Sequence, residues 1–139
     1  MEKPSLTMAQ QVAAAAAAFE KQRTGHAPQA VTVVLGDETL VITLHGALSP
    51  AERALAQTPE GAAQVQNFHR QLFNDSAASL RQEIKRITGV EVREAKAEVE
   101  TTTGTVVQVF STGTVVQVYL LAGGITADAW NSSGILNTS

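Results

Sequence analysis

The chain has no cysteine, few aromatic residues and no long apolar run within its 139 residues. Without cysteine there is no disulfide framework and no thiolate ligand for a structural zinc ion. The longest apolar tract near the N-terminus, residues 12–19, is mostly alanine and is much shorter than the roughly 20 residues that span a bilayer. The first residues also lack the net positive charge of a signal peptide. We therefore expect a cytoplasmic protein that does not span a membrane.

The charge balance is slightly acidic, with thirteen acidic residues against ten basic ones and a formal net charge of −3. Proteins that bind nucleic acid present clustered lysine and arginine side chains to the phosphates. The basic residues of this chain do not form such a cluster in the sequence. Nucleic acid is therefore not an expected partner, and the length suits one domain with its own core.

Two helix starts follow one another in the middle of the chain. Ser49 can cap a helix whose first turn holds Pro50, and Glu52 is placed to complete a capping box. The run Thr-Pro-Glu at residues 58–60 repeats the opening of a helix. The sequence therefore predicts a short helix over residues 49–56 and a separate one after it.

The second of these helices is long. Apolar residues recur at steps of three or four along residues 60–87, with an interruption at residues 74–76. Asp75 or Ser76 can cap a restarted helix there, so we expect a bend, and Gly89 supplies the C-terminal stop.

An alanine-rich stretch predicts another helix at the start of the chain, over residues 5–23. Ser5 is the expected N-cap of this helix. Gly25 is the expected C-terminal stop, because glycine accepts the left-handed conformation that ends many helices.

Four further segments have the β-branched composition of strands. Residues 30–35 and 39–44 flank a short turn and predict a β-hairpin. Residues 90–99 predict a third strand, but the apolar alternation changes phase at residues 93–94, where we expect a β-bulge. Residues 105–110 predict a fourth strand after a turn.

The heptapeptide TGTVVQV occurs twice, at residues 103–109 and again at residues 112–118, and Phe110 is answered by Tyr119. Each copy carries its own Thr-Gly turn and its own strand pattern. The second copy therefore predicts an added antiparallel strand, either at a sheet edge or in a neighbouring subunit.

Together these elements predict an α+β fold, with an antiparallel sheet and helices packed on one face, in the order α-β-β-α-α-β-β-(β). We expect an α+β domain over residues 1–110. Residues 111–139 would then hold the duplicated strand and a C-terminal tail.

No catalytic or metal site is expected from the sequence. His26, His45 and His69 lie on different predicted elements, and no two histidines have the four-residue spacing that would present both to one metal. The glycines fall outside the frames that cradle phosphates, so no nucleotide cofactor is expected. Capping explains Ser49 better than a nucleophilic role does, and it also explains the acidic residue Glu52.

Taken in order, these features resemble the MpsC family, small domains named for a sodium-translocating, membrane-potential-generating system. The resemblance covers about residues 5–110. The matching positions are Gly25, Pro28, Asp37, residues 46–49, Glu52, Leu55, residues 58–61, Arg70, Leu72, Ile84, residues 88–90, Val92 and residues 107–110.

The resemblance implies a soluble, non-catalytic accessory protein linked to a membrane ion or inorganic-carbon uptake system, with no cofactor. The expected partners are a second copy of the chain, as a homodimer or higher oligomer, and a membrane transporter component. The alternative is a structural protein that builds a filament or shell through its extra C-terminal strand. The positions expected to make protein contacts are Asp37, Glu52, Arg70, Thr114, Val116, Val118 and Tyr119.

Overall fold

The computed structural model describes residues 6–36 and 39–111. The helices are α1 (Met8–Thr24), α2 (Pro50–Leu55) and α3 (Pro59–Thr88), and the strands are β1 (Ala30–Leu35), β2 (Thr39–His45), β3 (Glu94–Glu100) and β4 (Thr105–Ser111). Their order along the chain is the predicted α-β-β-α-α-β-β. The eighth predicted element, the strand of the second repeat, lies outside the described residues.

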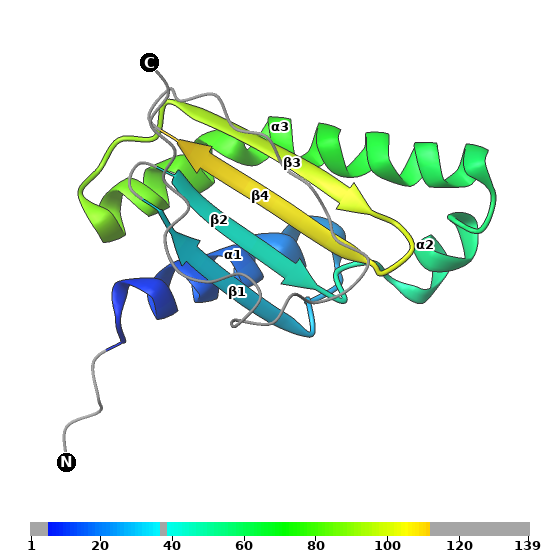
Figure 1. Cartoon of the computed structure of the whole chain (residues 1–139), viewed down its shortest axis with the longest axis horizontal. Helices are drawn as coiled ribbons and strands as arrows, with labels where there is room; N and C mark the ends of the chain where they lie inside the picture. The colour runs from blue at the N-terminus through cyan, green and yellow to red at the C-terminus, as the bar shows by residue number, and fades with distance from the viewer. Residues whose placement is uncertain (1–5, 37–38, 112–139) are drawn as a thin grey trace, which may run out of the picture.

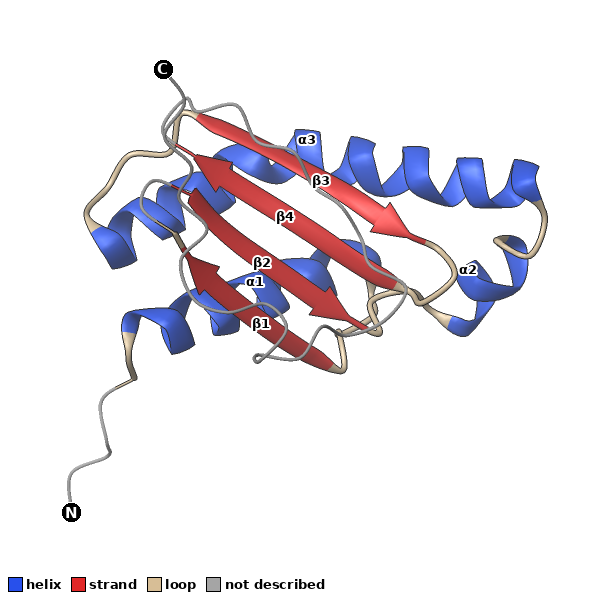
Figure 2. Ribbon diagram, viewed as in Figure 1, coloured by secondary structure: helices blue, strands red, loops and turns tan. Residues whose placement is uncertain are grey.

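The four strands form one antiparallel sheet in the order β1-β2-β4-β3. Helices α1 and α3 lie on one face of this sheet (Figure 1), so the predicted α+β class is confirmed. The first copy of the repeat contributes β4, which lies between β2 and β3 (Figure 2). This copy therefore pairs with a neighbour on both sides instead of forming an edge.

The core lies between the sheet and the two long helices. Alternate residues of β2 and β4 point toward the helices, and Ile42, Leu44 and Phe110 are at most 1% exposed. The Phe110 ring packs against that of Phe73 on α3, with ring centroids 5.9 Å apart. Gln108 is the polar exception in the inward row of β4, and it is also buried.

The predicted capping signals explain most of the helix ends. Ser49 and Glu52 form the expected capping box at the start of α2, and Gly25 ends α1 with φ 77°. Helix α1, however, begins after Thr7, so the prediction of Ser5 as its N-cap is wrong. The Thr7 hydroxyl accepts a hydrogen bond from the backbone N–H of Gln10, and the Gln10 side chain accepts one from Thr7 N–H. This second capping box fixes the start of α1.

Helix α3 runs without interruption from residue 59 to residue 88, so the predicted restart at Asp75 or Ser76 is wrong. The Ser76 hydroxyl does not cap a helix. It donates to the backbone carbonyls of Leu72 and Phe73 in the preceding turn. This contact satisfies the hydroxyl inside the helix, which lets a buried serine continue the core-facing row.

The predicted β-bulge at residues 93–94 is also wrong. Strand β3 begins only at Glu94 and keeps a regular register with β4 through Glu100. Val90 and Val92 precede the strand, in the segment that connects it to α3. The change of phase in the sequence therefore marks the boundary between this connection and the strand.

The junction of α2 and α3 requires a residue without a side chain. A Cβ atom placed on Gly61 would lie 1.8 Å from the backbone oxygen of Leu55, far inside van der Waals contact. Glycine at this position therefore allows the two helices to approach closely just after the Thr58 cap.

Candidate functional site

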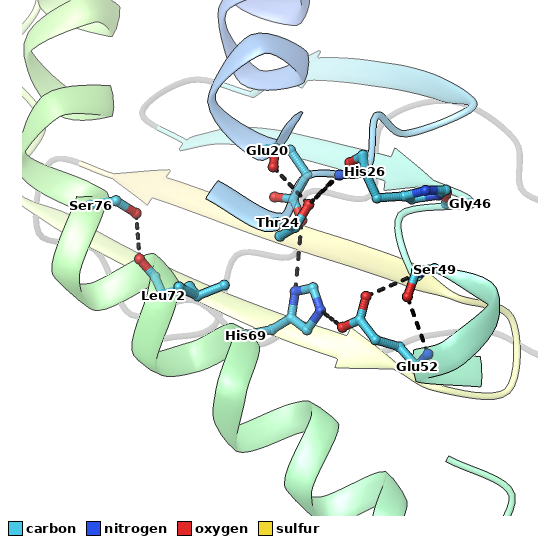
Figure 3. A network of polar contacts seen from close by, with 9 residues as sticks. All are labelled: Glu20, Thr24, His26, Gly46, Ser49, Glu52, His69, Leu72 and Ser76. Atoms are coloured by element: carbon cyan, nitrogen blue, oxygen red, sulfur yellow. Dashed lines mark hydrogen bonds and ion pairs between the residues drawn. The ribbon is translucent and has the colours of Figure 1, made fainter. Parts of the chain in front are cut away.

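Two carboxylates and an imidazole from three different helices meet beneath the sheet. Glu20 comes from α1, Glu52 from α2 and His69 from α3, and we call these three residues the buried polar cluster. The imidazole of His69 lies between the two acidic side chains (Figure 3). Its Nε2 is 2.6 Å from Glu52 Oε2, and its Nδ1 is 3.7 Å from Glu20 Oε1. The side chains of His69 and Glu20 are only 3% and 9% exposed.

Glu52 is held in its ionised form. Its second oxygen accepts a hydrogen bond from the backbone N–H of Ser49, whose hydroxyl accepts in turn from Glu52 N–H. Partial burial of Glu52 opposes ionisation. Hydrogen bonds from Ser49 and His69 outweigh this effect and lower the pKa of Glu52 below its usual 4.5. The residue predicted as a cap thus also joins α2 to α3.

Glu20 has the opposite environment. Burial raises the pKa of its carboxyl above 4.5, and this effect, together with the nearby Glu52 charge, exceeds the opposing attraction of His69 and Arg23. Glu20 Oε1 has no hydrogen-bond partner among the described residues. Two carboxyl groups on either side of one imidazole therefore have pKa values shifted in opposite directions, a pattern found often at functional sites.

A small cavity of about 20 Å³ borders the cluster. Its walls include Glu20, His69, Ser76 and Gln108. Gln108 Oε1, like Glu20 Oε1, is a buried acceptor without a partner in the described part of the chain. The volume suits one water molecule, whose two protons match the two acceptors.

An open apolar groove of about 330 Å³ lies between the first turns of α1 and the last turns of α3. Its walls are formed chiefly by Met8, Val33, Leu35, Ile84 and Val90, and we call this surface the apolar groove. Met8, Leu35 and Val90 are 59%, 75% and 55% exposed. Large apolar side chains that gather at one place on a surface typically mark a binding site.

Two of the seven residues expected to make protein contacts, Glu52 and Arg70, lie among the described residues. Glu52 belongs to the buried polar cluster. Arg70 pairs with Glu98 of β3 at 3.1 Å, and both side chains are nearly half exposed. Asp37 and the positions of the second repeat lie outside the described residues: Thr114, Val116, Val118 and Tyr119. The structure therefore places only Glu52 in a candidate site.

Sequence reasoning did not select Glu20 and His69 as site residues. A signal for both was available in the helical spacing. Glu20 lies four residues after the buried Ala16, and His69 lies four residues from Val65 and from Phe73. A polar group at a position where the helix faces the core calls for a buried partner.

The other two histidines contact separate segments. His26 Nε2 lies 3.1 Å from the carbonyl of Gly46, and His45 Nε2 lies 3.0 Å from the Thr32 hydroxyl. Within the described ranges, no group of three or more histidine or acidic side chains could hold a metal ion. Over the same residues, none of the helices combines the length and apolar character needed to cross a membrane.

Comparison with known proteins gives two matches. Residues 5–113 match the family described as the Na+-translocating membrane potential-generating system (MpsC). The chain is also similar to the uncharacterized protein YbcI of Bacillus subtilis (strain 168), at 24% identity over 110 residues that cover 79% of this chain and 89% of YbcI. No solved structure matches the chain. Because the family match spans most of the sequence, the chain belongs to the MpsC family.

Proposed function

We propose that this protein is a non-catalytic accessory domain that works with a membrane ion or inorganic-carbon uptake system at the cytoplasmic face of the membrane. The family description names a membrane system that translocates Na+. The observation that carries the proposal is the apolar groove, with its exposed rim of Met8, Leu35 and Val90. Such an apolar surface suits contact with another protein better than catalysis on a polar substrate.

The buried polar cluster supports a non-catalytic role. The His69 side chain is only 3% exposed, and the cavity beside it has room for one water-sized molecule. The imidazole is therefore largely shielded from a dissolved substrate. We therefore assign the buried polar cluster a structural role, in which its ionisable side chains contact one another.

The apolar groove has the dimensions of a docking site. Its volume of about 330 Å³ lies at the lower end of the range for ligand pockets, roughly 300 to 1,000 Å³. Its walls come from both long helices and the β1–β2 hairpin, so the groove is formed in the unbound protein. The proposed occupant is an apolar segment of a transporter component, such as one face of an amphipathic helix.

Uptake measurements in cells can test this proposal. A strain without the gene would be complemented with the wild type, Leu35→Glu or Val90→Glu, and uptake of sodium and bicarbonate would be measured. Phe68→Glu is the matched control, because Phe68 is a 50% exposed apolar residue of α3 that is not part of the groove wall. Thermal melts would establish that each variant is folded.

We expect the wild type and Phe68→Glu to restore uptake and to recover the transporter component on purification. Both groove variants should fail in the two assays while remaining folded. Full activity of the groove variants would refute docking through the groove. Turnover of a metabolite by the purified protein would refute the non-catalytic assignment.

A second candidate function is self-assembly through the repeat. The first copy, which forms β4, pairs on both of its sides, so this sequence is suited to strand pairing. Residues 112–118 carry the same seven letters. Light scattering on the full chain and on a chain ending at Ser111 distinguishes the two candidates. Loss of large assemblies in a shortened chain that still folds favours self-assembly.

A further inference from the structure

Two buried valines lie on the outer face of the sheet, the face opposite α1 and α3 (Figure 1). Side chains alternate along β4, and Gln108 and Phe110 point toward the helices, so Val107 and Val109 point the other way. Val107 and Val109 are nevertheless only 4% and 2% exposed. Neither belongs to the core cluster between the sheet and the helices. Their burial therefore has another source.

The neighbouring strands do not account for this burial. Val34, Val41 and Val109 are cross-strand neighbours on β1, β2 and β4, so they share the outer face. Val34 is 56% exposed, and Val41, which also lies on an interior strand, is only partly buried. None of the described helices covers this face (Figure 2). The cover over Val107 and Val109 therefore comes from outside the described residues.

Three segments of the chain lie outside the described residues, and only the last one suits this position. Residues 37–38 join β1 to β2 at the end of the sheet that holds Ser111, roughly 13 Å along β4 from Val107. Residues 1–5 precede α1, which lies on the opposite face, and two of these five residues are charged. Residues 112–139 follow directly on Ser111, the last residue of β4. This segment therefore begins on the strand that is covered.

The composition of residues 112–139 also suits contact with an apolar surface. Asp128 is the only residue of the segment with a charged side chain. Large apolar residues gather at residues 115–121 and 135–136, and Trp130 lies between these two groups. A segment with so little charge loses little hydration when it covers valine side chains. Most of it lies beyond residue 113, where the match to the MpsC family ends.

We propose that residues 112–139 pack on the outer face of the sheet of their own chain and cover Val107 and Val109. The two valines are buried within a single chain, so the cover needs no second copy. The segment closes an apolar surface that would otherwise be a second binding site. Phe110 borders the apolar groove from the helix side of the sheet, so a partner can occupy the groove while the outer face stays closed.

Paramagnetic labelling of the full chain tests this proposal by nuclear magnetic resonance. The sequence has no cysteine, so a nitroxide reacts only with a cysteine that is introduced. Val34→Cys places the label at an exposed position on the outer face, two strand spacings or roughly 10 Å from Val109. Ala78→Cys, on the exposed side of α3, is the matched control. The amide signals of residues 112–139 would be compared before and after reduction of the nitroxide.

We expect the label at position 34 to broaden amide signals of residues 112–139 and the label at position 78 to leave them sharp. Two samples distinguish contact within a chain from contact between chains. In the first, a ¹⁵N chain that carries the nitroxide is diluted with unlabelled chain. In the second, a ¹⁵N chain without nitroxide is mixed with a ¹⁴N chain that carries it. Broadening should appear in the first sample and be absent from the second.

A charge beneath the cover provides an independent test. Val107→Glu, in the chain labelled at position 34, should release the segment, because a buried carboxylate against apolar side chains is costly. The broadening of residues 112–139 should then be lost. Thr32→Glu is the matched control, since Thr32 lies in the same cross-strand row as Val107 but is exposed, and it should retain the broadening. The amide signals of α3 would establish that both variants are folded.

Three results would overturn the proposal. Sharp signals for residues 112–139 in the first sample would show that the segment does not lie on the outer face. Broadening in the second sample alone would assign the cover to a second copy and favour self-assembly through the repeat. Broadening that persists in a folded Val107→Glu chain would exclude an apolar contact at Val107. None of these measurements depends on the docking function proposed for the apolar groove.

Discussion

Replacing Glu52 with alanine removes two contacts of its carboxylate, one with Ser49 and one with His69, and each has its own expected cost in stability. Loss of the hydrogen bond from Ser49 N–H to the Glu52 carboxylate, one half of the capping box at α2, should cost about 0.5 to 1.5 kcal/mol. Loss of the charge-assisted hydrogen bond to His69 should cost a further ~1.5 to 3 kcal/mol, because the imidazole N–H stays buried without an acceptor. We expect a total decrease of about 2 to 4.5 kcal/mol in the free energy of unfolding.

Ser49→Ala is the matched control for this prediction. It removes the hydroxyl that accepts from Glu52 N–H but leaves the carboxylate in contact with His69. Urea unfolding of both variants near neutral pH measures the two costs. Because each variant loses one of the two hydrogen bonds of the capping box, the extra cost of Glu52→Ala reports the contact between α2 and α3. Equal costs for Glu52→Ala and Ser49→Ala would refute a stabilising role for the His69 contact.

The same pair of variants has a defined pH dependence. The pKa of Glu52 is lowered in the folded protein, so its charge contributes stability that is present above 4.5 and is lost as the pH falls through the folded value. The cost of Glu52→Ala should therefore shrink in acid. The cost of Ser49→Ala should change less, since the hydroxyl does not titrate. A cost of Glu52→Ala that grew in acid would contradict the assigned charge state.

Three further substitutions test the packing of the fold. Gly61→Ala should lower stability by about 1 to 3 kcal/mol in urea unfolding, because its methyl group collides with the Leu55 carbonyl; an unchanged midpoint would contradict this close approach. Phe110→Ala should cost about 3 to 5 kcal/mol, since the ring is 1% exposed in the core; a cost below that of a surface substitution would exclude Phe110 from the core. Arg70→Ala should cost at most about 1 kcal/mol, because its ion pair with Glu98 is nearly half exposed; a larger loss, measured by the same method, would indicate a contact beyond this pair.

Local chemistry accounts for the features that could be predicted. The capping box of Ser49 and Glu52 lies within four consecutive residues, and Gly25 and Gly89 each end a helix through their own backbone conformation. The sequence offers two hydroxyls, those of Ser5 and Thr7, that can cap α1, so the presence of a hydroxyl alone does not identify the N-cap. The deciding residue was Gln10, three positions after Thr7, which completes a capping box there.

The remaining features depend on contacts between distant parts of the chain. Glu20 and His69 are 49 positions apart, and only the antiparallel packing of α1 against α3 brings them together. The helical spacing marks each residue as facing the core but does not identify its partner. Likewise, the sequence predicts that a strand starts at Val90, whereas in the structure Val90 precedes β3 and forms part of the wall of the apolar groove.

Helix α1 contributes fewer buried residues to the core than α3 does. Its fully buried residues are Val12, Ala16 and Glu20, whereas α3 buries eight residues along its length. Burial of an apolar side chain contributes in proportion to its area, roughly 0.8 kcal/mol per methylene group, and alanine offers little area. The attachment of α1 to the core therefore depends on few large side chains, with Phe19 partly buried beside them. Because Met8 of the same helix forms part of the wall of the apolar groove, the position of α1 also sets the shape of the groove.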